Sequence, residues 1–502
     1  MNRLAVLSLC FLPLAGWWLY GLFDLDEGFY GAATMEMLRR NEWITPYYNG
    51  QPWFEKPILI YWLAKPSIML VGPQFGARLP SVLSALALYW MTMSFALRYF
   101  RLTPAQSEKI SQRIRAADYA TNAAAIAGLA LGTSLLVVAL GRMMMTDMPL
   151  AVALSGAWFS FWRGLTEKRA WWILTGFWLG VSVLAKGPIG IILSVPIFGY
   201  GAWIMRGKRP FQLGTVLAIP GAMIACAAVT ATWYWPAYAQ NGDVFVQKFL
   251  IEQNWNRFLG GDRAHSIGLA GLLAFVPVIL LGFAPWSWFL VKAWPRKSDD
   301  EVAKFVAACA LIPFLFFTIS SAKLPHYVLP CFAPLALLVG RYLATQWDRV
   351  MDWALGWAFG VAVLANVGFF YWYGRSGQAE VHTLARQMPL GATLIVYQMP
   401  RRGSELGTLK PKLQETSLPS IEFVLNKTVI QAETAADFPA FSKDKTFYVI
   451  TRSSRLESLK SDLKLAGFDP VGAGYTYGVY DTTENFVLRG LKQAKANPTA
   501  PP

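Results

Sequence analysis

Charged residues are scarce in this chain. Only 15% of its 502 residues are Asp, Glu, Lys or Arg, whereas 55% are hydrophobic. A soluble domain of ordinary composition carries about 25% charged residues. The low charge and the length together exclude a single soluble domain and indicate a protein that crosses a membrane several times.

Cysteine is also rare, and the chain has no evident internal repeat. All four cysteines lie in apolar stretches, at Cys10, Cys226, Cys309 and Cys331. Neither a disulfide framework nor a cysteine metal cluster is therefore expected. The lack of a repeat argues against transporter folds that are built from two related halves.

Long apolar runs separated by short basic loops are the main feature that is present. The first run, Leu4–Leu22, is long enough to cross a hydrocarbon core, and the bulky residues at its end do not suit a signal peptidase, so we expect it to be retained. Further spans are expected near 76–97, 119–140, 148–163, 171–185, 188–205, 213–236, 268–291, 303–319, 327–345 and 353–373. The pattern predicts about eleven membrane helices, or about thirteen if short or broken ones are present.

The basic residues predict the topology. Lys and Arg cluster in four short loops, at 98–115, 163–169, 206–209 and 292–304. By the positive-inside rule these loops and the N-terminus face the cytoplasm, and the C-terminus lies outside. The net charge of +15 is thereby explained by topology, and nucleic acid is not an expected partner.

From about Gly374 the composition changes to short β-rich runs that alternate with polar helical stretches. The β-rich runs are Ala392–Tyr397, Ile421–Leu425, Thr446–Thr451 and Tyr475–Tyr480, and Ser454–Leu465 is expected to be helical. We therefore expect a membrane domain over 1–373, a small α/β domain outside the membrane over 374–495, and a disordered Pro-rich tail over 496–502.

The loop at 24–74, which follows the first span, is too long for a simple connection and contains two helical patterns that are expected to lie along the membrane surface. Asp24, Asp26 and Glu27 stand at the start of the first pattern, Gly28–Arg40. A carboxylate held at a membrane edge can position or deprotonate an acceptor group. An acidic residue in this place can equally cap the helix, and the two roles are compatible.

The other outer connections carry further polar residues, each with a plain structural alternative. Lys56 can meet a lipid phosphate or form a local salt bridge with the adjacent Glu55. Asp147, which follows Arg142, can face Asp26 across a cavity or cap the next helix.

Lys186 and Lys323 lie at the outer ends of spans. There they can bind an anion or reach the interface by snorkelling. His326 and Tyr327 stand close to Lys323 between two prolines, where a bend holds hydrogen-bond donors at the interface.

The second long outer loop adds Arg257 and His265. Arg257 can clamp a phosphate with two hydrogen bonds, whereas His265 can bind a metal or make a structural hydrogen bond. Carboxylates and cations thus converge on one membrane face. This suits displacement of a phosphate diester from a sugar, because the leaving phosphate needs cations and the sugar carbon needs a positioned acceptor.

Six motifs carry a family resemblance. They are DEGFYGAATMEML (26–38), YYNGQPWFEKP (47–57), RMMMTDMP (142–149), AKGPIG (185–190), EQNWNRF (252–258) and SAKLPHYVLPCFAPLALL (321–338). With them, in this order, the chain resembles the membrane glycosyltransferases with the GT-C fold that use polyprenyl-phosphate sugars, especially the bacterial lipid A aminoarabinose transferases and the related protein mannosyltransferases.

The resemblance implies roles for individual residues. Asp26 and Asp147 are implied as the catalytic-site carboxylates. The carrier phosphate is expected to be bound by Lys56, Arg257, Lys323 and Tyr327, and further active-site candidates are Glu27, Arg142, Lys186 and His326.

Two positions depart from the family pattern and bear on a metal. Phe29 stands where the aminoarabinose enzymes usually have Arg. Gln253 stands where the family usually has His, so that a divalent metal, zinc or magnesium, at Glu55 would need another ligand such as His265.

The function implied by the resemblance is transfer of a sugar, for example 4-amino-4-deoxy-L-arabinose, from undecaprenyl phosphate to lipid A or another glycolipid. The expected location is the bacterial inner membrane, with the active site and the C-terminal domain in the periplasm and the bilayer and the lipid-linked donor as partners. Two alternatives stay open. One is transfer to Ser or Thr of a protein, and the other is a polyprenyl-lipid transporter or flippase, which predicts charges through the membrane interior.

Overall fold

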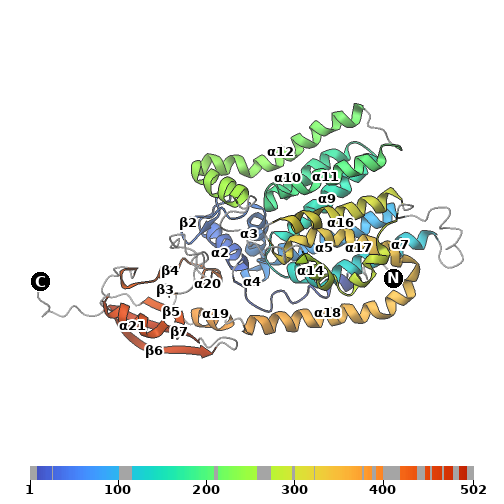
Figure 1. The fold of residues 1–502 in the computed structure, drawn as a ribbon. Coiled ribbons are helices and arrows are strands. Elements are labelled where there is room, and N and C mark those ends of the chain that lie inside the picture. The colour runs from blue at the N-terminus through green and yellow to red at the C-terminus, as the bar shows by residue number, and fades with distance from the viewer. Residues whose placement is uncertain are drawn as a thin grey trace, which may run out of the picture. The chain divides into compact units, whose positions relative to one another are not determined.

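The computed structural model in Figure 1 describes most of the chain. The described residues are 8–24, 26–100, 116–208, 213–256, 273–296, 300–320, 323–375, 378–386, 392–398, 419–437, 447–452, 455–465, 468–478 and 485–493. The chain forms two compact units. The first contains Met1–Trp17 and Phe54–Val367, and the second contains Trp18–Trp53 and Gly368–Pro502.

The first unit is helical. Its helices are α3 (Leu59–Val71), α4 (Pro73–Gly76), α5 (Leu79–Tyr99), α7 (Ala116–Gly132), α8 (Leu135–Gly141), α9 (Asp147–Thr166), α10 (Trp171–Lys186), α11 (Ile189–Met205), α12 (Leu213–Asn241), α13 (Asp243–Phe245), the π-helix η1 (Val246–Asn256), α14 (Phe275–Gly282), η3 (Trp286–Phe289), α15 (Leu290–Ala293), α16 (Glu301–Ile319), η4 (Pro325–Cys331), α17 (Phe332–Leu343) and η5 (Ala344–Gln346). Helix α18 (Trp347–Arg375) runs from the first unit into the second. Within the first unit, α10 packs against α9 and α12, and α7 packs against α5 and α17 (Figure 1).

Several of these helices suit a membrane. Among the described residues five are long and apolar enough to cross one, and two bent helix pairs raise the number to seven if each pair is one span. Three more apolar helices, α3, α10 and α11, are shorter, with 13, 16 and 17 residues. The total of about eleven to thirteen spans expected from the apolar runs stays a prediction.

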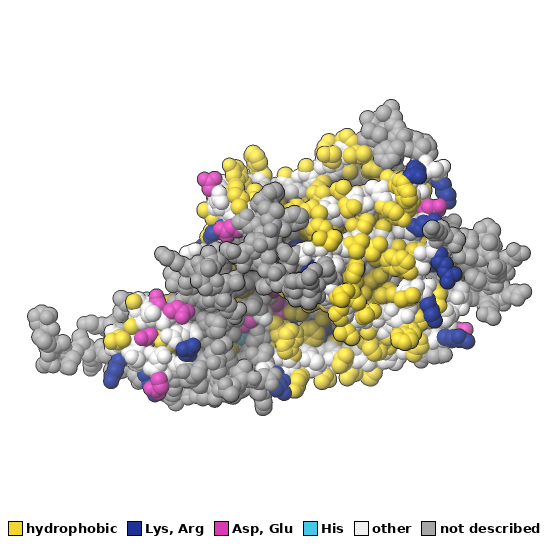
Figure 2. Space-filling model, in the orientation of Figure 1, with side chains coloured by type: hydrophobic (Ala, Val, Ile, Leu, Met, Phe, Trp, Pro, Cys, Tyr) yellow, Lys and Arg dark blue, Asp and Glu magenta, His cyan; other side chains and the backbone are white. Residues whose placement is uncertain are grey.

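The outer surface of the helices is apolar. Figure 2 shows hydrophobic side chains spread across the helical part, with Lys and Arg gathered at one margin. Large exposed side chains include Phe177 on α10, Trp203 on α11, Ile224 on α12 and Phe359 on α18. An apolar surface of this extent is costly in water and is favourable against lipid tails, so the helices form a polytopic membrane unit.

The second unit combines α2 (Asp26–Arg39) and the hairpin β1 (Tyr47–Tyr48) and β2 (Gln51–Pro52) with a C-terminal α/β part. That part contains α19 (Gln378–Arg386), β3 (Thr393–Tyr397), α20 (Ser420–Leu425), β4 (Ile430–Ala432), η7 (Ala435–Asp437), β5 (Phe447–Arg452), α21 (Leu456–Leu465), β6 (Phe468–Gly478) and β7 (Asn485–Gln493). The strand order is β4-β3-β5-β7-β6. Strand β3 pairs in parallel with β4 and β5, while β7 pairs antiparallel with β5 and β6.

Alternation along β3 gives the sheet two buried faces. Leu394 and Val396 pack in a cluster with residues of α19 and α20. Ile395 and Tyr397 pack in a second cluster with Leu459 and other residues of α21 and β5. Because successive side chains of a strand point to opposite faces, one short apolar strand supports helices on both sides of the sheet.

One predicted strand is wrong. Ile421–Leu425 belongs to the helix α20, with Pro419 before it and Asn426 after it in the left-handed conformation. Pro before a helix and Asn after it are terminal signals that outweigh the β propensity of a short apolar run.

Candidate functional site

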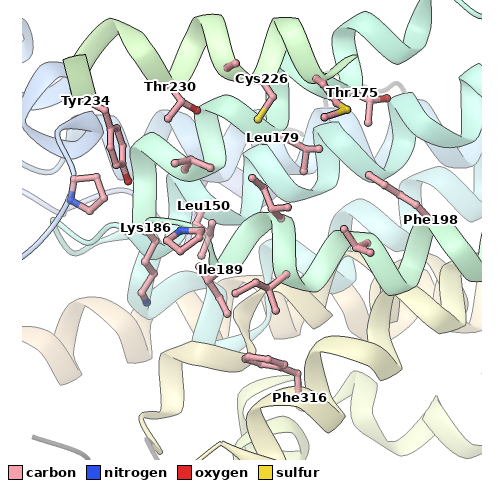
Figure 3. A pocket seen from close by; sticks show the side chains of 18 of the residues that line it. Leu150, Thr175, Leu179, Lys186, Ile189, Phe198, Cys226, Thr230, Tyr234 and Phe316 are labelled. Atoms are coloured by element: carbon pink, nitrogen blue, oxygen red, sulfur yellow. The ribbon is translucent and has the colours of Figure 1, made fainter. Parts of the chain in front are cut away.

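A large cavity, with a volume of about 1010 Å³, lies in the first unit. It is lined by parts of α9, α10, α11, α12, η1 and α16, together with the segment before α3. Its charged side chains are Glu55, Lys56, Asp147 and Lys186. Figure 3 shows Lys186 and Tyr234 toward one end of the cavity and Phe198 toward the other. The cavity is thus polar at one end and mostly apolar along its length.

Asp147 and Lys186 form a buried ion pair in the cavity wall. Lys186 Nζ donates to Asp147 Oδ1 at 2.6 Å. Asp147 is the first residue of α9 and Lys186 is the last residue of α10, so the anion lies at a helix N-terminus and the cation at a helix C-terminus, as the helix dipoles favour. The ammonium also lies 4.6 Å from the centre of the Tyr327 ring, a cation–π contact.

Asp147 keeps one oxygen for a further donor. Asp147 as a whole is 2% exposed. Its Oδ2 atom is buried and has no hydrogen-bond partner within the described parts of the chain. Besides Lys186, Lys56 and His326 lie close enough to act on this carboxylate electrostatically. Asp147 therefore lies at the start of a helix, as predicted, and its carboxylate also lines the cavity.

Glu55 and Lys56 are brought together at the cavity. Lys56 Nζ lies 3.7 Å from Glu55 Oε1, and both side chains are nearly buried. The local salt bridge between Glu55 and Lys56 is therefore present. Both residues also line the cavity, so the salt bridge does not prevent Lys56 from meeting a phosphate there. Gln253, in the position where the family usually has His, lines it too.

Other predicted residues are placed differently. Lys323 Nζ donates to the carbonyl of Phe317 at 2.9 Å and to that of Thr318, and Lys323 is not one of the residues that line the cavity. His326 lies edge-on to the Tyr327 ring, with 4.9 Å between ring centres. The hydrogen bonds of Lys323 to the two carbonyls fit a structural role, in which its ammonium satisfies carbonyls at the last turn of α16.

Arg142 is buried in the packing of the first unit. Its Nη1 donates to the carbonyl of Pro13 at 3.0 Å, and its Nη2 donates to Asn366 Oδ1 at 2.9 Å. These bonds join three segments that are far apart in the sequence, and Arg142 does not line the cavity. A buried guanidinium with such bonds fixes helix packing.

Asp26, Glu27 and Phe29 belong to the second unit. Asp26 is the first residue of α2 and is partly exposed. Glu27 is 1% exposed, and its Oε2 accepts from the backbone N–H of Phe23 at 2.8 Å. Phe29 is fully buried and stacks on Trp53 with 4.9 Å between ring centres. The residue that replaces the usual Arg is therefore a core residue.

The predicted metal ligands do not form a set in the described residues. No group of three His, Cys, Asp or Glu side chains that could hold an ion occurs in the part of the chain that the structure describes. Arg257 and His265 lie outside the described residues. A metal at Glu55 stays a prediction.

Tyr234 and Thr230 of α12 line the cavity and were missed by the sequence analysis. Both lie within a long apolar run, where a single hydroxyl carries no pattern that separates a cavity residue from one facing lipid. Their position became evident only from the packing of α12 against α10.

The helical membrane unit, followed in the chain by an α/β part, has the GT-C fold. One similar solved structure is ArnT from Cupriavidus metallidurans bound to undecaprenyl phosphate. It superposes with a TM-score of 0.72 at 18% sequence identity and covers 97% of this chain and 96% of that one.

Sequence comparisons agree with the fold. Residues 113–235 match the family described as dolichyl-phosphate-mannose-protein mannosyltransferase. The chain is 30% identical over 339 residues to an undecaprenyl phosphate-alpha-4-amino-4-deoxy-L-arabinose arabinosyl transferase of Enterobacter sp. (strain 638), and 32% identical over 357 residues to one of Pectobacterium carotovorum subsp. carotovorum (strain PC1). The matches cover 65% and 68% of this chain but only 56% and 58% of the relatives. They confirm the resemblance to the GT-C polyprenyl-phosphate sugar transferases.

Proposed function

We propose that this chain is a membrane glycosyltransferase that moves a sugar from undecaprenyl phosphate to lipid A or another glycolipid of the cell envelope. The observation that carries the proposal is the cavity of about 1010 Å³. Its polar end is lined by Lys56, Lys186 and Asp147, and the rest of its lining is mostly apolar. Such a cavity matches a lipid with one anionic group. The similar arabinosyl transferases support 4-amino-4-deoxy-L-arabinose as the sugar.

In this proposal the cations act on the phosphate. Breaking the bond between the sugar C1 and the phosphate oxygen leaves a negative charge on the polyprenyl phosphate. Lys56 and Lys186 are fixed at the cavity by Glu55 and Asp147, so they are already oriented when this charge develops. The Tyr327 hydroxyl is proposed as a further phosphate donor at the same cavity.

The carboxylates act on the sugar and the acceptor. Asp147 Oδ2, which is buried at the cavity, is positioned to accept a hydrogen bond from a hydroxyl or ammonium group of the sugar. Asp26 is proposed to take the proton of an acceptor hydroxyl while the new bond forms at C1 with inversion. If the acceptor is an anionic lipid A phosphate, no proton is removed and Asp26 orients the acceptor.

The location proposed is the bacterial inner membrane. The four basic loops support a cytoplasmic N-terminus, with the active site and the C-terminal domain, 374–495, in the periplasm. The exposed hydrophobic side chains of Figure 2 support contact of the helices with the bilayer.

Reconstitution tests the activity. The purified chain, in liposomes with lipid A and undecaprenyl-phosphate aminoarabinose, is expected to give lipid A with the added mass of the sugar. The Asp26→Asn variant is expected to lose this product, because Asn cannot take the proton of a hydroxyl acceptor and cannot replace the carboxylate that orients a phosphate acceptor. Glu457→Gln is a matched control, since Glu457 forms an exposed pair with Lys460 of the same helix. Unchanged turnover of Asp26→Asn would remove Asp26 from the mechanism.

Transfer to protein is the second candidate, favoured by the match of residues 113–235 to the protein mannosyltransferase family. It predicts a sugar on Ser or Thr of a membrane-associated protein and unmodified lipid A. Mass spectrometry of both fractions from cells with and without the chain separates the two acceptors.

A further inference from the structure

Four residues of the second unit form a continuous chain of hydrogen bonds. Asp24 Oδ1 accepts from the backbone N–H of Ser420 at 2.7 Å, and Asp24 Oδ2 accepts from Ser420 Oγ at 2.8 Å. Ser420 Oγ lies 2.7 Å from His382 Nε2. His382 Nδ1 lies 2.7 Å from the hydroxyl of Tyr373. Asp24, Ser420, His382 and Tyr373 are named the Asp24 relay below.

The relay has a defined proton order. An ionised Asp24 only accepts hydrogen bonds, so the Ser420 hydroxyl donates its single proton to Asp24 and must accept from His382 Nε2. A neutral His382 protonated at Nε2 accepts at Nδ1, and Tyr373 supplies that proton. Every donor therefore points toward Asp24. Ser420 and His382 are 0% and 1% exposed, which shields these bonds from competing water.

Two glycines leave the space that the relay occupies. A Cβ on Gly28 would lie 2.8 Å from the backbone nitrogen of Ser420 and would overlap Asp24 Oδ1. A Cβ on Gly21 would lie 2.8 Å from His382 Nδ1. Real Cβ atoms do not approach so closely, so the chain on both sides of Asp24 is built to admit the partners of the relay.

The relay anchors the turn that carries Asp26. Phe23 N–H donates to Glu27 Oε2 at 2.8 Å, and Gly28 N–H donates to the Phe23 carbonyl at 2.9 Å, so the turn is closed across its base. Asp24 ties the same turn to Ser420. Asp26 lies inside this turn as the first residue of α2, between the two anchored positions.

We propose that Asp24, Ser420 and His382 are positioning residues that hold the first turn of α2 and thereby aim the Asp26 carboxylate at the acceptor. The proposal rests on the proposed function. It gives the C-terminal α/β part a role in the reaction, because Ser420 and His382 come from α20 and α19. A misplacement of about 1 Å at a reacting group costs about 100-fold in rate.

The main test compares two substitutions of Asp24. Asp24→Ala removes both bonds to Ser420, and kcat is expected to fall by about 10- to 100-fold, while KM for the lipid-linked donor changes less than about 2-fold. Asp24→Asn can keep both bonds: its oxygen accepts from the Ser420 N–H, its amide donates to Ser420 Oγ, and Ser420 then donates to His382. The proton order reverses, and most of kcat is expected to return.

Asp437 provides the matched control in the same unit. Its Oδ2 accepts from the N–H groups of Glu433 and Thr434 at 2.9 Å each and from Thr434 Oγ1 at 3.1 Å, a similar contact that involves no residue of α2. Asp437→Ala is expected to leave kcat unchanged. The effects of Asp24→Ala and Ser420→Ala on kcat are expected to be non-additive, whereas those of Asp24→Ala and Asp437→Ala are expected to add.

Two outcomes overturn the proposal. One is an Asp24→Ala protein that folds less well but has the wild-type kcat per folded molecule, which makes Asp24 merely structural. The other is an Asp437→Ala protein that loses as much kcat as Asp24→Ala.

Hydrogen exchange separates this proposal from the proposed function. In the full chain in detergent micelles, Asp24→Ala is expected to speed amide exchange in the first turns of α2 by about 10-fold or more, with no such change in Asp437→Ala. This measurement needs no activity. A wild-type chain that transfers no sugar overturns the proposed function alone, and unchanged exchange in α2 overturns the relay as an anchor.

Discussion

Replacing Lys186 with Met is expected to destabilise the first unit more than replacing its partner Asp147 with Asn. The two charged atoms lie 2.6 Å apart, with the Asp147 side chain 3% exposed and the Lys186 side chain 17% exposed. Without the ammonium, a buried carboxylate loses its nearest cation, which costs about 3–5 kcal/mol. Without the carboxylate, the ammonium still reaches water and the Tyr327 ring, and the cost is about 1.5 kcal/mol.

The double variant makes the reasoning sharper. Combining Lys186→Met with Asp147→Asn removes the uncompensated charge, so the double variant is expected to be more stable than Lys186→Met alone. The assay is equilibrium unfolding of each purified variant in mixed detergent micelles, followed by tryptophan fluorescence. Lys208→Met is the control: the Lys208–Glu301 pair is 2.8 Å long, but Lys208 is 65% exposed, and its loss is expected to cost less than about 1 kcal/mol.

Two results would refute this account of the pair. The first is a Lys186→Met protein no less stable than the Lys208→Met control. The second is a double variant that loses the sum of the two single losses, because additivity would mean that Asp147 and Lys186 do not depend on each other in the folded state.

Burial raises the pKa of Glu422 from its usual 4.5 to about 8. The folded state then holds a proton that the unfolded state releases, so stability is greatest below about pH 4.5, falls as the pH rises and levels off above about pH 8. Thermal unfolding at several pH values is expected to show that Glu422→Gln removes this fall. Gly28→Ala is expected to cost about 1–3 kcal/mol by overpacking, whereas Gly374→Ala, with no atom within 4 Å of the new Cβ, is expected to be neutral or slightly stabilising in the same assay. Lys56→Met is expected to raise KM for the lipid-linked donor by about 10-fold or more. Lys323→Met is not expected to do so, because the Lys323 ammonium is bonded to backbone carbonyls at the end of α16 and Lys323 is not one of the residues that line the cavity.

Each of these has a contrary outcome. The same pH dependence in Glu422→Gln and wild type would assign the titration to another group. Equal stability of Gly28→Ala and Gly374→Ala would show that the backbone around α2 can shift without cost. If Lys56→Met and Lys323→Met raised KM equally, Lys323 would also be a phosphate-binding residue.

The agreement between sequence and structure is best where one segment decides the result. The helix over 28–40 is present as α2, and the β-rich runs at 392–397 and 446–451 correspond to β3 and β5. In each case apolar spacing or terminal residues within a few positions carry the signal. The run at 421–425 was misassigned for the same reason, since four apolar residues and one Glu cannot by themselves distinguish a strand from one turn of a buried helix.

The candidate site was predicted in part. The sequence grouped Lys56, Asp147 and Lys186 with the polar residues of one membrane face, and these three line the cavity. It grouped Arg142 and Lys323 with them on the same grounds, yet neither lines it. A cation at the end of a span can point into a cavity or bond to a neighbouring segment, and only the neighbours decide which.

By itself, the sequence determined that this is a membrane protein of many helices with polar residues in the loops between them, because the length of an apolar run and the charge of a loop respond directly to the bilayer. The tertiary structure alone decided which polar residues meet. Asp24 is hydrogen-bonded to Ser420, which is 396 positions away in the sequence, and Asp147 is hydrogen-bonded to Lys186, which is 39 positions away. Such contacts depend on how distant segments pack, and no local pattern around Asp24 or Asp147 records the partner.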